Sequence, residues 1–483
     1  MESSGSDPLE IVIVSLEEKM HFRIYNDIAK LCSLVIRSCE ADSLFLKFSC
    51  VSDRAKSCIQ EKIREKVGML FEPFPARLCI RQLQETDLDE DFFQELEKFI
   101  QELDEKGDRF SMIGLAQVLD ESLHEQLQMQ VRSFQADRFT VVLNTNRESV
   151  GIGVLPRCSC VWERKHRLSH SYNQLDNFLV NLFLLENTVL NDMIDKHFFL
   201  PDEFFPVFSA TKKLNIAASP LRIERRFSTE RFERENVQYF RIYYDNCDFT
   251  EDNECVWNKI LEASKAECDI IVFPELLGNP QMETYIRSKI DALDDDEKRS
   301  LPAMIILPSL WEKCFNTVTV LDRTGKVVCR QSKQNPFRLE GAGNGYLEDI
   351  IANQVINIFH YEGIGRFAIL ICKDFLTTKY MEQLMRCFKL TLIIVPSFSS
   401  GSYDFRQSFD LCAHDDCNVV WINTCASMTS GKEDNFENIG YVRKRIGRND
   451  DDSQKLCCMP ICEGAFCGVC KHDCIFYESI PGV

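Results

Sequence analysis

Apolar segments of strand length alternate with amphipathic helical segments from residue 238 onward, and this alternation constrains the fold more than any other feature. Helical periodicity is clear at 254–267 and at 281–293. Apolar runs separated by helices are typical of sheets that carry helices on their faces. The strand-like runs lie at 239–246, 268–275, 303–311, 355–363, 367–371, 391–397 and 418–425. The sequence therefore predicts a layered α/β domain over residues 238–483.

The preceding part of the chain has a different pattern, and residues 1–208 are predicted to form an α+β accessory domain. A short alternating strand is expected at 8–16, and a long helix at 171–199. Further helices are expected at 22–39, 55–71 and 89–107. Residues 209–237 are polar and rich in Arg and Glu, which predicts a charged connector between the two domains.

Composition and charge exclude several classes of protein. The chain has 483 residues, 45% of them hydrophobic and 27% charged, as in an ordinary soluble protein. Its formal net charge of −19 argues against a broad nucleic-acid surface or an anionic-membrane surface. The first residues lack the pattern of a signal peptide, and no stretch reaches the roughly 18–20 apolar residues that span a bilayer. A cytoplasmic protein without a membrane partner is expected.

Three strand ends or loops in the second half carry residues suited to acyl transfer. Glu275 ends an apolar strand and could serve as a general base. Lys333 could stabilise an oxyanion and keep a thiolate charged, and Cys372 could be a nucleophile at a strand-to-helix corner. Plainer alternatives remain for each: a surface acid, a solvated loop lysine, and a small apolar residue that closes a strand.

The order and context of these residues resemble the nitrilase, or carbon–nitrogen hydrolase, superfamily. The motifs are Phe273-Pro274-Glu275, Lys333 after a hairpin, and Ile371-Cys372-Lys373-Asp374. Supporting similarities are found in Asn316-Thr317-Val318 before Asp322 and Gly325, in Pro336-Phe337 before Glu340, in Val395-Pro396-Ser397, and in Asn423. The resemblance covers about residues 236–445 and implies a four-layer α-β-β-α sandwich that commonly dimerises through its helices.

The resemblance also implies roles for the residues in the motifs. Glu275 would be the general base, Lys333 the stabiliser of the tetrahedral intermediate, and Cys372 the nucleophile. Glu340 would be a supporting acid that orients Lys333 or the substrate, and the backbone N–H of Lys373 would contribute to the oxyanion hole. Asp374 closes the cysteine motif as a further supporting residue. No cofactor is implied for catalysis.

Lys373 departs from the family pattern, which usually has an aromatic or acidic residue after the cysteine. A second ammonium group there would lower the pKa of the thiol further. Alternatively, its side chain could point away from the thiol or select an anionic substrate.

The C-terminal segment 457–474 is dense in cysteine. Cys467 and Cys470 form a C-x₂-C pair, with Cys462 and Cys474 at short loop spacings on either side. Four thiolates on one tight loop suit tetrahedral zinc, which would stabilise a segment that is too small for a core of its own. Free thiols packed in a strand are an equally open alternative, and a redox pair is a third.

Two functions of different classes follow from these observations. The first is a thiol-dependent hydrolase that cleaves the C–N bond of a small amide or nitrile through a cysteine thioester. The second is a catalytically quiet scaffold or oligomerisation module in a multi-component assembly, such as an anti-phage defence system. In both cases the chain is expected to form a homo-oligomer, as a dimer or a larger assembly.

Overall fold

The computed structural model groups the described residues into two compact units that do not follow the expected domain boundaries. It describes residues 44–68, 89–136, 141–142, 152–158, 175–186, 193–221, 223, 225–339, 345–401, 404–405, 408–409, 412, 417–427, 438–444, 456–460 and 474–481. Unit 1 comprises 1–130, 144–157 and 172–188, and unit 2 comprises 131–143, 158–171 and 189–483. The second unit therefore begins well before residue 238.

Unit 1 is built mainly from helices around one apolar core. Its helices are α2 (Leu44–Ser49), α3 (Asp53–Gly68), α4 (Glu90–Glu105), α5 (Arg109–Ser122) and the first half of α6 (His124–Ala136). Strands β2 (Ile152–Pro156) and β3 (Leu182–Glu186) pair antiparallel beside the short helix η4 (Leu175–Phe178). The predicted helices at 55–71 and 89–107 are confirmed, and the Asp89 side chain caps α4 by accepting from the N–H of Phe92.

The long helix predicted at 171–199 is wrong. These residues instead supply η4, β3 and strand β4 (Ile194–Phe199), and β4 lies in a large sheet of unit 2. Phe198 and Phe199 of β4 are buried, whereas Ile194 at its start is exposed, and neighbouring strands pair with β4 on both sides. Periodicity alone does not separate such a segment from a buried helix.

Unit 2 contains an eight-stranded sheet that carries the Cys372 corner. Its order is β1-β4-β15-β16-β17-β18-β19-β20, and β16, β17 and β18 run parallel to one another. The strands not yet bounded are β1 (Val141–Val142), β15 (Val355–Tyr361), β16 (Gly365–Ile369), β17 (Leu392–Pro396), β18 (Asn418–Ile422), β19 (Asn438–Arg443) and β20 (Leu456–Pro460). Helices α13 (Lys373–Leu376) and α14 (Thr378–Phe388) connect β16 to β17. The carboxyl ends of the parallel strands therefore meet at one edge.

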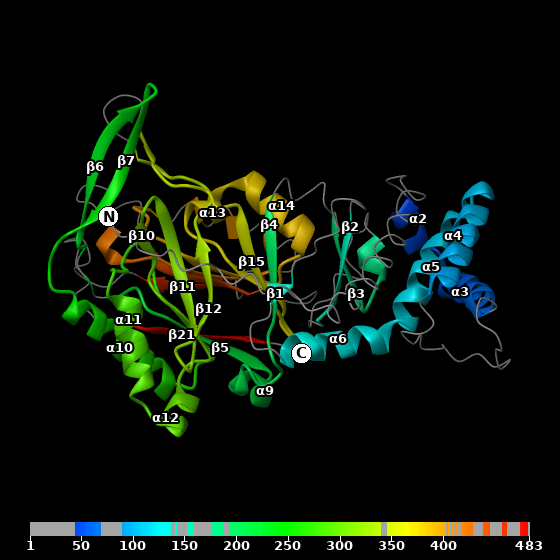
Figure 1. Ribbon diagram of the computed structural model, residues 1–483, viewed down its shortest axis with the longest axis horizontal. Coiled ribbons are helices and arrows are strands. Elements are labelled where there is room, and N and C mark those ends of the chain that lie inside the picture. Colours follow the sequence, from blue (N-terminus) through cyan, green and yellow to red (C-terminus); the bar gives the residue numbers. More distant parts are fainter. Residues whose placement is uncertain are drawn as a thin grey trace, which may run out of the picture. The chain divides into compact units, whose positions relative to one another are not determined.

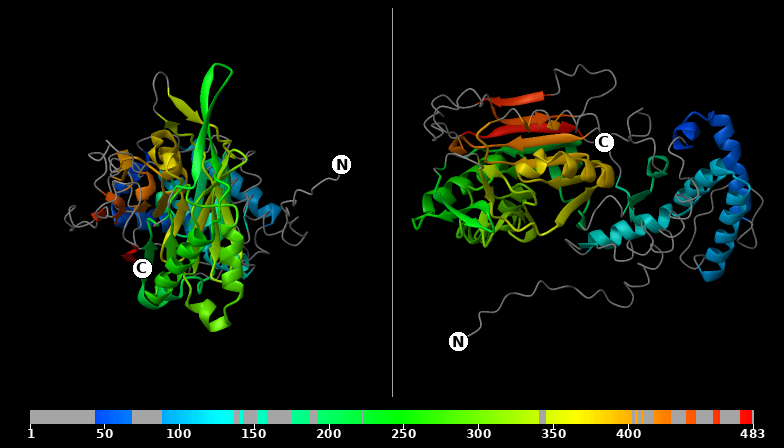
Figure 2. Two further views of the ribbon diagram at one scale, coloured as in Figure 1. Left: turned by 90° about the vertical axis from the view of Figure 1, so that its left-hand side faces the viewer. Right: turned by 90° about the horizontal axis from the view of Figure 1, so that it is seen from above.

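A second sheet of unit 2 carries Glu275 and Lys333. Its order is β10-β11-β9-β8-β5-β21, and β12 pairs with β11. The strands are β5 (Lys213–Ala218), β8 (Ile270–Val272), β9 (Met304–Ile306), β10 (Leu310–Glu312), β11 (Phe315–Asp322), β12 (Val327–Ser332) and β21 (Phe476–Pro481). Helices α10 (Thr250–Lys265) and α11 (Met282–Asp291) bury apolar side chains against β5, β8 and β9. Figures 1 and 2 show α10, α11 and α12 (Asp295–Ser300) gathered beside this sheet.

The expected charged connector at 209–237 is not a connector. Its residues include part of α9 (Pro206–Thr211), all of β5 and strand β6 (Phe227–Arg234). Strand β6 forms a hairpin with β7 (Val237–Tyr244), which continues to β14 (Tyr346–Glu348) and β13 (Arg338–Leu339) in a four-stranded sheet. Its many charged residues are explained by exposure, because Figure 1 shows the hairpin projecting from the body of unit 2.

The described chain is α/β, as predicted, and no helix within it is both long enough and apolar enough to cross a bilayer. The predicted helices at 254–267 and 281–293 are confirmed as α10 and α11, and the predicted hairpin before Lys333 is confirmed as β11 and β12.

Candidate active site

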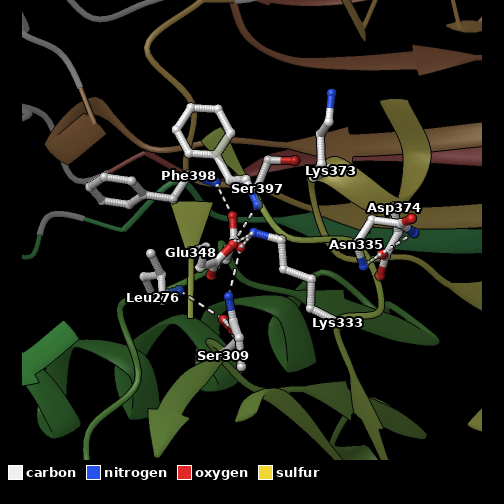
Figure 3. Close-up of polar contacts among 12 residues, drawn as sticks. Leu276, Ser309, Lys333, Asn335, Glu348, Lys373, Asp374, Ser397 and Phe398 are labelled. Carbon is white, nitrogen blue, oxygen red and sulfur yellow. Dashed lines mark hydrogen bonds and ion pairs between the residues drawn. The ribbon is translucent and has the colours of Figure 1, made fainter. Parts of the chain in front are cut away.

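A buried lysine between two carboxylates forms the centre of the site. The Nζ atom of Lys333 lies 2.8 Å from Oε1 of Glu275 and 2.8 Å from Oε2 of Glu348. All three side chains are at most 3% exposed. Figure 3 shows Lys333 and Glu348 meeting at the centre of this network. Each residue follows or ends a strand: Glu275 comes after β8, Lys333 directly after β12, and Glu348 at the end of β14.

Several donors fix the orientation of the Glu275 carboxylate. The side-chain amide of Asn316 donates to Oε1 at 2.7 Å, and the backbone N–H of Phe398 donates to Oε2 at 2.9 Å. Asn316 is itself held by the hydroxyl of Ser309, which donates to its Oδ1 at 2.7 Å and accepts from the N–H of Leu276 at 2.8 Å. A carboxylate held in this way is positioned before any substrate arrives.

Cys372 occupies a strained corner between β16 and α13. Its φ of 46° and ψ of −99° are rare for a residue with a Cβ, and its backbone N–H donates to the carbonyl of Pro396 at 2.9 Å. The Cys372 thiol lies close enough to Glu275 and Lys333 for their charges to act on its pKa. The structure thus brings together Glu275, Lys333 and Cys372, the three residues proposed from the sequence.

The electrostatics differ from the expectation that Lys333 keeps Cys372 as a thiolate. Burial, and then the charge of Glu275, raise the pKa of the Cys372 thiol far above its ordinary value, and Lys333 offsets only part of this effect. Burial lowers the pKa of Lys333, but the two carboxylates and Cys372 more than compensate, so its pKa lies well above the ordinary value. The single positive charge is already matched by two negative charges. The thiol therefore rests protonated beside a carboxylate that can accept its proton.

Asp374 ties the cysteine corner to the loop that carries Lys333. Its Oδ1 atom accepts from the backbone N–H groups of Gln334 at 3.0 Å and Asn335 at 2.7 Å, and from the Asn335 side chain at 2.8 Å. Figure 3 shows the contact with Asn335. Asp374 is buried, and burial raises its pKa to about 7 against the opposing effect of these hydrogen bonds.

Asp374 should make the stability of the protein fall as the pH rises from about 4 to about 7. In this window the folded state keeps a proton that the unfolded state has lost, so folding becomes less favourable until the buried carboxyl ionises. The free energy of unfolding of the wild type should fall by a few kcal/mol over this range, and Asp374→Asn should abolish this fall. Urea unfolding at pH 5 and pH 7.5 measures this change in stability. An equal change in the wild type and in Asp374→Asn would contradict the role assigned to Asp374.

A glycine is required at position 278, because the loop after Glu275 there passes close to the backbone between β9 and β10. A Cβ at this position would lie 2.6 Å from the carbonyl oxygen of Pro308 and 2.8 Å from that of Ser309. We expect Gly278→Ala to lower the free energy of unfolding by about 1–3 kcal/mol and to slow reactions of Cys372, because Ser309 must move.

Gly325→Ala is the matched control for Gly278→Ala. The φ of Gly325 is +79°, but a Cβ there would make only ordinary contacts, the nearest at 3.5 Å. This variant should lose about 1–2 kcal/mol through backbone strain and leave Cys372 unaffected. Equal reactivity of Cys372 in both variants would refute the role assigned to Gly278. Urea unfolding and alkylation of Cys372 provide the two measurements.

The remaining predicted site residues have different outcomes. Glu340 lies outside the described residues, and within the described part Glu348 is the second carboxylate on Lys333. Lys373 is half-buried, and Figure 3 shows its side chain directed away from Lys333 and Glu348. Its backbone N–H belongs to the first turn of α13, where N–H groups have no acceptor within the helix.

The predicted zinc ligands cannot be assembled from the described residues. Cys462, Cys467 and Cys470 lie outside them, and Cys474 is half-buried with its carbonyl accepting from the hydroxyl of Ser219 at 3.1 Å. Among the described residues, no group of three or more His, Cys, Asp or Glu side chains is arranged to hold a metal ion.

Glu348, Asn316 and Phe398 were not proposed as site residues from the sequence. Glu348 carried a usable signal, because it ends a short strand-like run, Tyr346-Leu347-Glu348, as Glu275 ends its own. Phe398 contributes through its backbone N–H, which no side-chain pattern can reveal.

No protein-family model and no curated protein match this sequence. Among solved structures, the chain is similar to the C. elegans NitFhit protein, with 14% identity over 56% of this chain and 61% of that one, and a TM-score of 0.33. It is also similar to a mutant of the amidase from Nesterenkonia sp. AN1 in complex with butyramide, with 13% identity over 56% of this chain and 91% of that one, and a TM-score of 0.36.

A third similar structure is another mutant of the Nesterenkonia amidase, which carries the acetamide moiety of fluoroacetamide on its active-site cysteine. The identity is 12% over 56% of this chain and 90% of that one, with a TM-score of 0.34. TM-scores of this size do not establish a common fold.

Proposed function

We propose that this protein is a thiol-dependent carbon–nitrogen hydrolase that cleaves a small amide or nitrile through a thioester on Cys372. The observation that carries the proposal is that one buried carboxylate, Glu275, lies 2.8 Å from the ammonium of Lys333 and is close enough to Cys372 for its charge to raise the pKa of the thiol. The strand-end placement of these residues resembles a nitrilase-type site, and the proposal includes the four-layer α-β-β-α arrangement and homo-oligomerisation through helix faces.

For an amide, the first half-reaction forms the thioester. Glu275 takes the proton of the Cys372 thiol as the sulfur attacks the carbonyl carbon. The negative charge that develops on the carbonyl oxygen is stabilised by the ammonium of Lys333 and the backbone N–H of Lys373. The C–N bond then breaks, and the proton held by Glu275 passes to the leaving nitrogen, which departs as ammonia or an amine.

The second half-reaction restores the enzyme. Glu275 takes a proton from water while the hydroxide oxygen attacks the thioester carbon. The C–S bond breaks, the carboxylic acid leaves, and the proton on Glu275 returns to the sulfur. Lys333 remains an ammonium throughout, in keeping with its raised pKa.

The experiment is incubation of the full chain with a panel of aliphatic and aromatic amides and nitriles. Ammonia release and the mass of the Cys372 peptide are measured, and hydroxylamine is added to trap the thioester as a hydroxamate. Cys372→Ala is the inactive control. We expect ammonia and a trapped acyl group with the wild type alone. Absence of acylation, together with a Cys372 that reacts with iodoacetamide like the exposed Cys58, would favour the scaffold instead.

A further inference from the structure

Asp349, the residue after Glu348, is held by two arginines from the β6–β7 hairpin. Its Oδ1 atom lies 2.9 Å from the guanidinium of Arg234, and its Oδ2 atom lies 2.6 Å from Nε of Arg241. Each guanidinium also stacks on an aromatic ring of the hairpin, Arg234 over Tyr239 and Arg241 over Phe232, at 4.6 Å from each ring centroid. Asp349 is only 6% exposed. We call this set of Asp349, Arg234 and Arg241 the hairpin clamp.

The hairpin clamp is directly continuous with the site. Strand β14 pairs with β7 so that Glu348 lies opposite Phe240, and the backbone N–H of Asp349 donates to the Phe240 carbonyl at 3.0 Å. The side chain of Glu348 turns the other way, and its Oε2 accepts from Lys333 and from the N–H of Phe337 at 2.9 Å. Backbone bonds to β7 and β13 flank this three-residue strand, and the clamp fixes the residue that follows it.

Such a short strand has few ladder hydrogen bonds with which to fix its position. β14 shares only two paired positions with β7 and two with β13. An arginine that is already stacked on a ring loses little freedom when it binds a carboxylate, so two such arginines hold Asp349 in a narrow range of positions. Displacement of Asp349 would also leave a buried carboxylate without a partner.

We infer that Arg234, Arg241 and Asp349 are positioning residues, which place Glu348 on Lys333 and so set the position of the catalytic ammonium. The hairpin thus contributes to the site although none of its arginines contacts Lys333 or Cys372 in the described interactions. The inference rests on the proposed function for the role of Lys333 in catalysis, but the position of Lys333 can be tested without it.

The test uses the variants Asp349→Asn, Arg241→Gln and Arg241→Lys of the full chain. Trace acetylation of lysines, read by mass spectrometry, reports the position of Lys333, with the buried Lys259 as an internal reference. We expect Lys333 to be labelled about tenfold faster in Asp349→Asn and Arg241→Gln, Arg241→Lys to recover part of the protection, and Lys259 to remain unchanged. Arg299→Gln, which removes an exposed pair with Asp296, is the matched control and should have no effect.

A second arm measures the alkylation rate of Cys372 at neutral pH, which should fall about tenfold in Asp349→Asn. If Asp349 acts through Glu348, the same change should have no further effect in a Glu348→Gln background. Unchanged labelling of Lys333 in both Asp349→Asn and Arg241→Gln, or full additivity with Glu348→Gln, would overturn the inference. If wild-type Cys372 lacks base-assisted reactivity, the proposed function fails, and Lys333 labelling still decides the positioning role.

Discussion

Replacement of Lys333 by Met is expected to lower the free energy of unfolding by about 3–5 kcal/mol, although the side chain keeps nearly the same volume. The ammonium of Lys333 lies 2.8 Å from both Glu275 and Glu348, and all three groups are buried. Its removal leaves two carboxylates close together without a cation. Urea unfolding at pH 7.5 measures the loss.

The triple variant Lys333→Met/Glu275→Gln/Glu348→Gln separates charge from packing. Because no unpaired charge remains, it should recover most of the stability lost in Lys333→Met. It should not recover the reactivity of Cys372, because both the base and the ammonium are gone. Lys259→Met serves as the control: Lys259 is equally buried, but its partner Glu262 is 39% exposed and can be solvated. A loss in Lys333→Met no larger than in Lys259→Met would contradict the account.

Replacement of Glu275 by Gln is expected to slow acylation of Cys372 by about 10²–10⁴-fold, the range for removal of a general base. Gln preserves the size of the side chain and one acceptor, so the fold should persist, but it cannot accept the thiol proton. The loss should therefore fall mainly on kcat rather than on KM. The measurement is the rate of ammonia release with the best amide of the panel, or the alkylation rate of Cys372.

Glu262→Gln is the control for Glu275→Gln, because it makes the same chemical change in the ion pair on α10. It should leave the rate unchanged. If Glu275→Gln retained the wild-type rate, Glu275 would not be the base, whatever its distance from Lys333.

The strand ends of the site could be predicted from the sequence because apolar runs bounded by charged residues leave little choice of structure. Glu275 and Cys372 each follow such a run, and Lys333 follows a hairpin with a clear turn. Glu348 also ends a short strand-like run, but its place beside Lys333 could not be predicted, because it depends on the pairing of β14 with β7, more than a hundred residues earlier in the chain. The charged residues of the segment at 227–234 indicated a connector, whereas the segment is an exposed strand that pairs with the adjacent β7.

The protonation state of Cys372 also lay beyond the sequence. Lys333 does lower the pKa of the thiol, but burial and the charge of Glu275 raise it by more. The prediction of a helix at 171–199 was wrong because the spacing of apolar residues in a strand inside a sheet can match that of one helical face.

The pH dependence of Cys372 alkylation tests the central claim most directly. An ordinary thiol reacts as its thiolate, so its alkylation rate rises about tenfold per pH unit between pH 6.5 and pH 8. The exposed Cys58 is followed in the same experiment as the comparison. With Glu275 as the base, the rate at Cys372 should be nearly constant over this range, and should become pH-dependent in Glu275→Gln. A rate at Cys372 that rises in parallel with Cys58 in the wild type would contradict the proposed site.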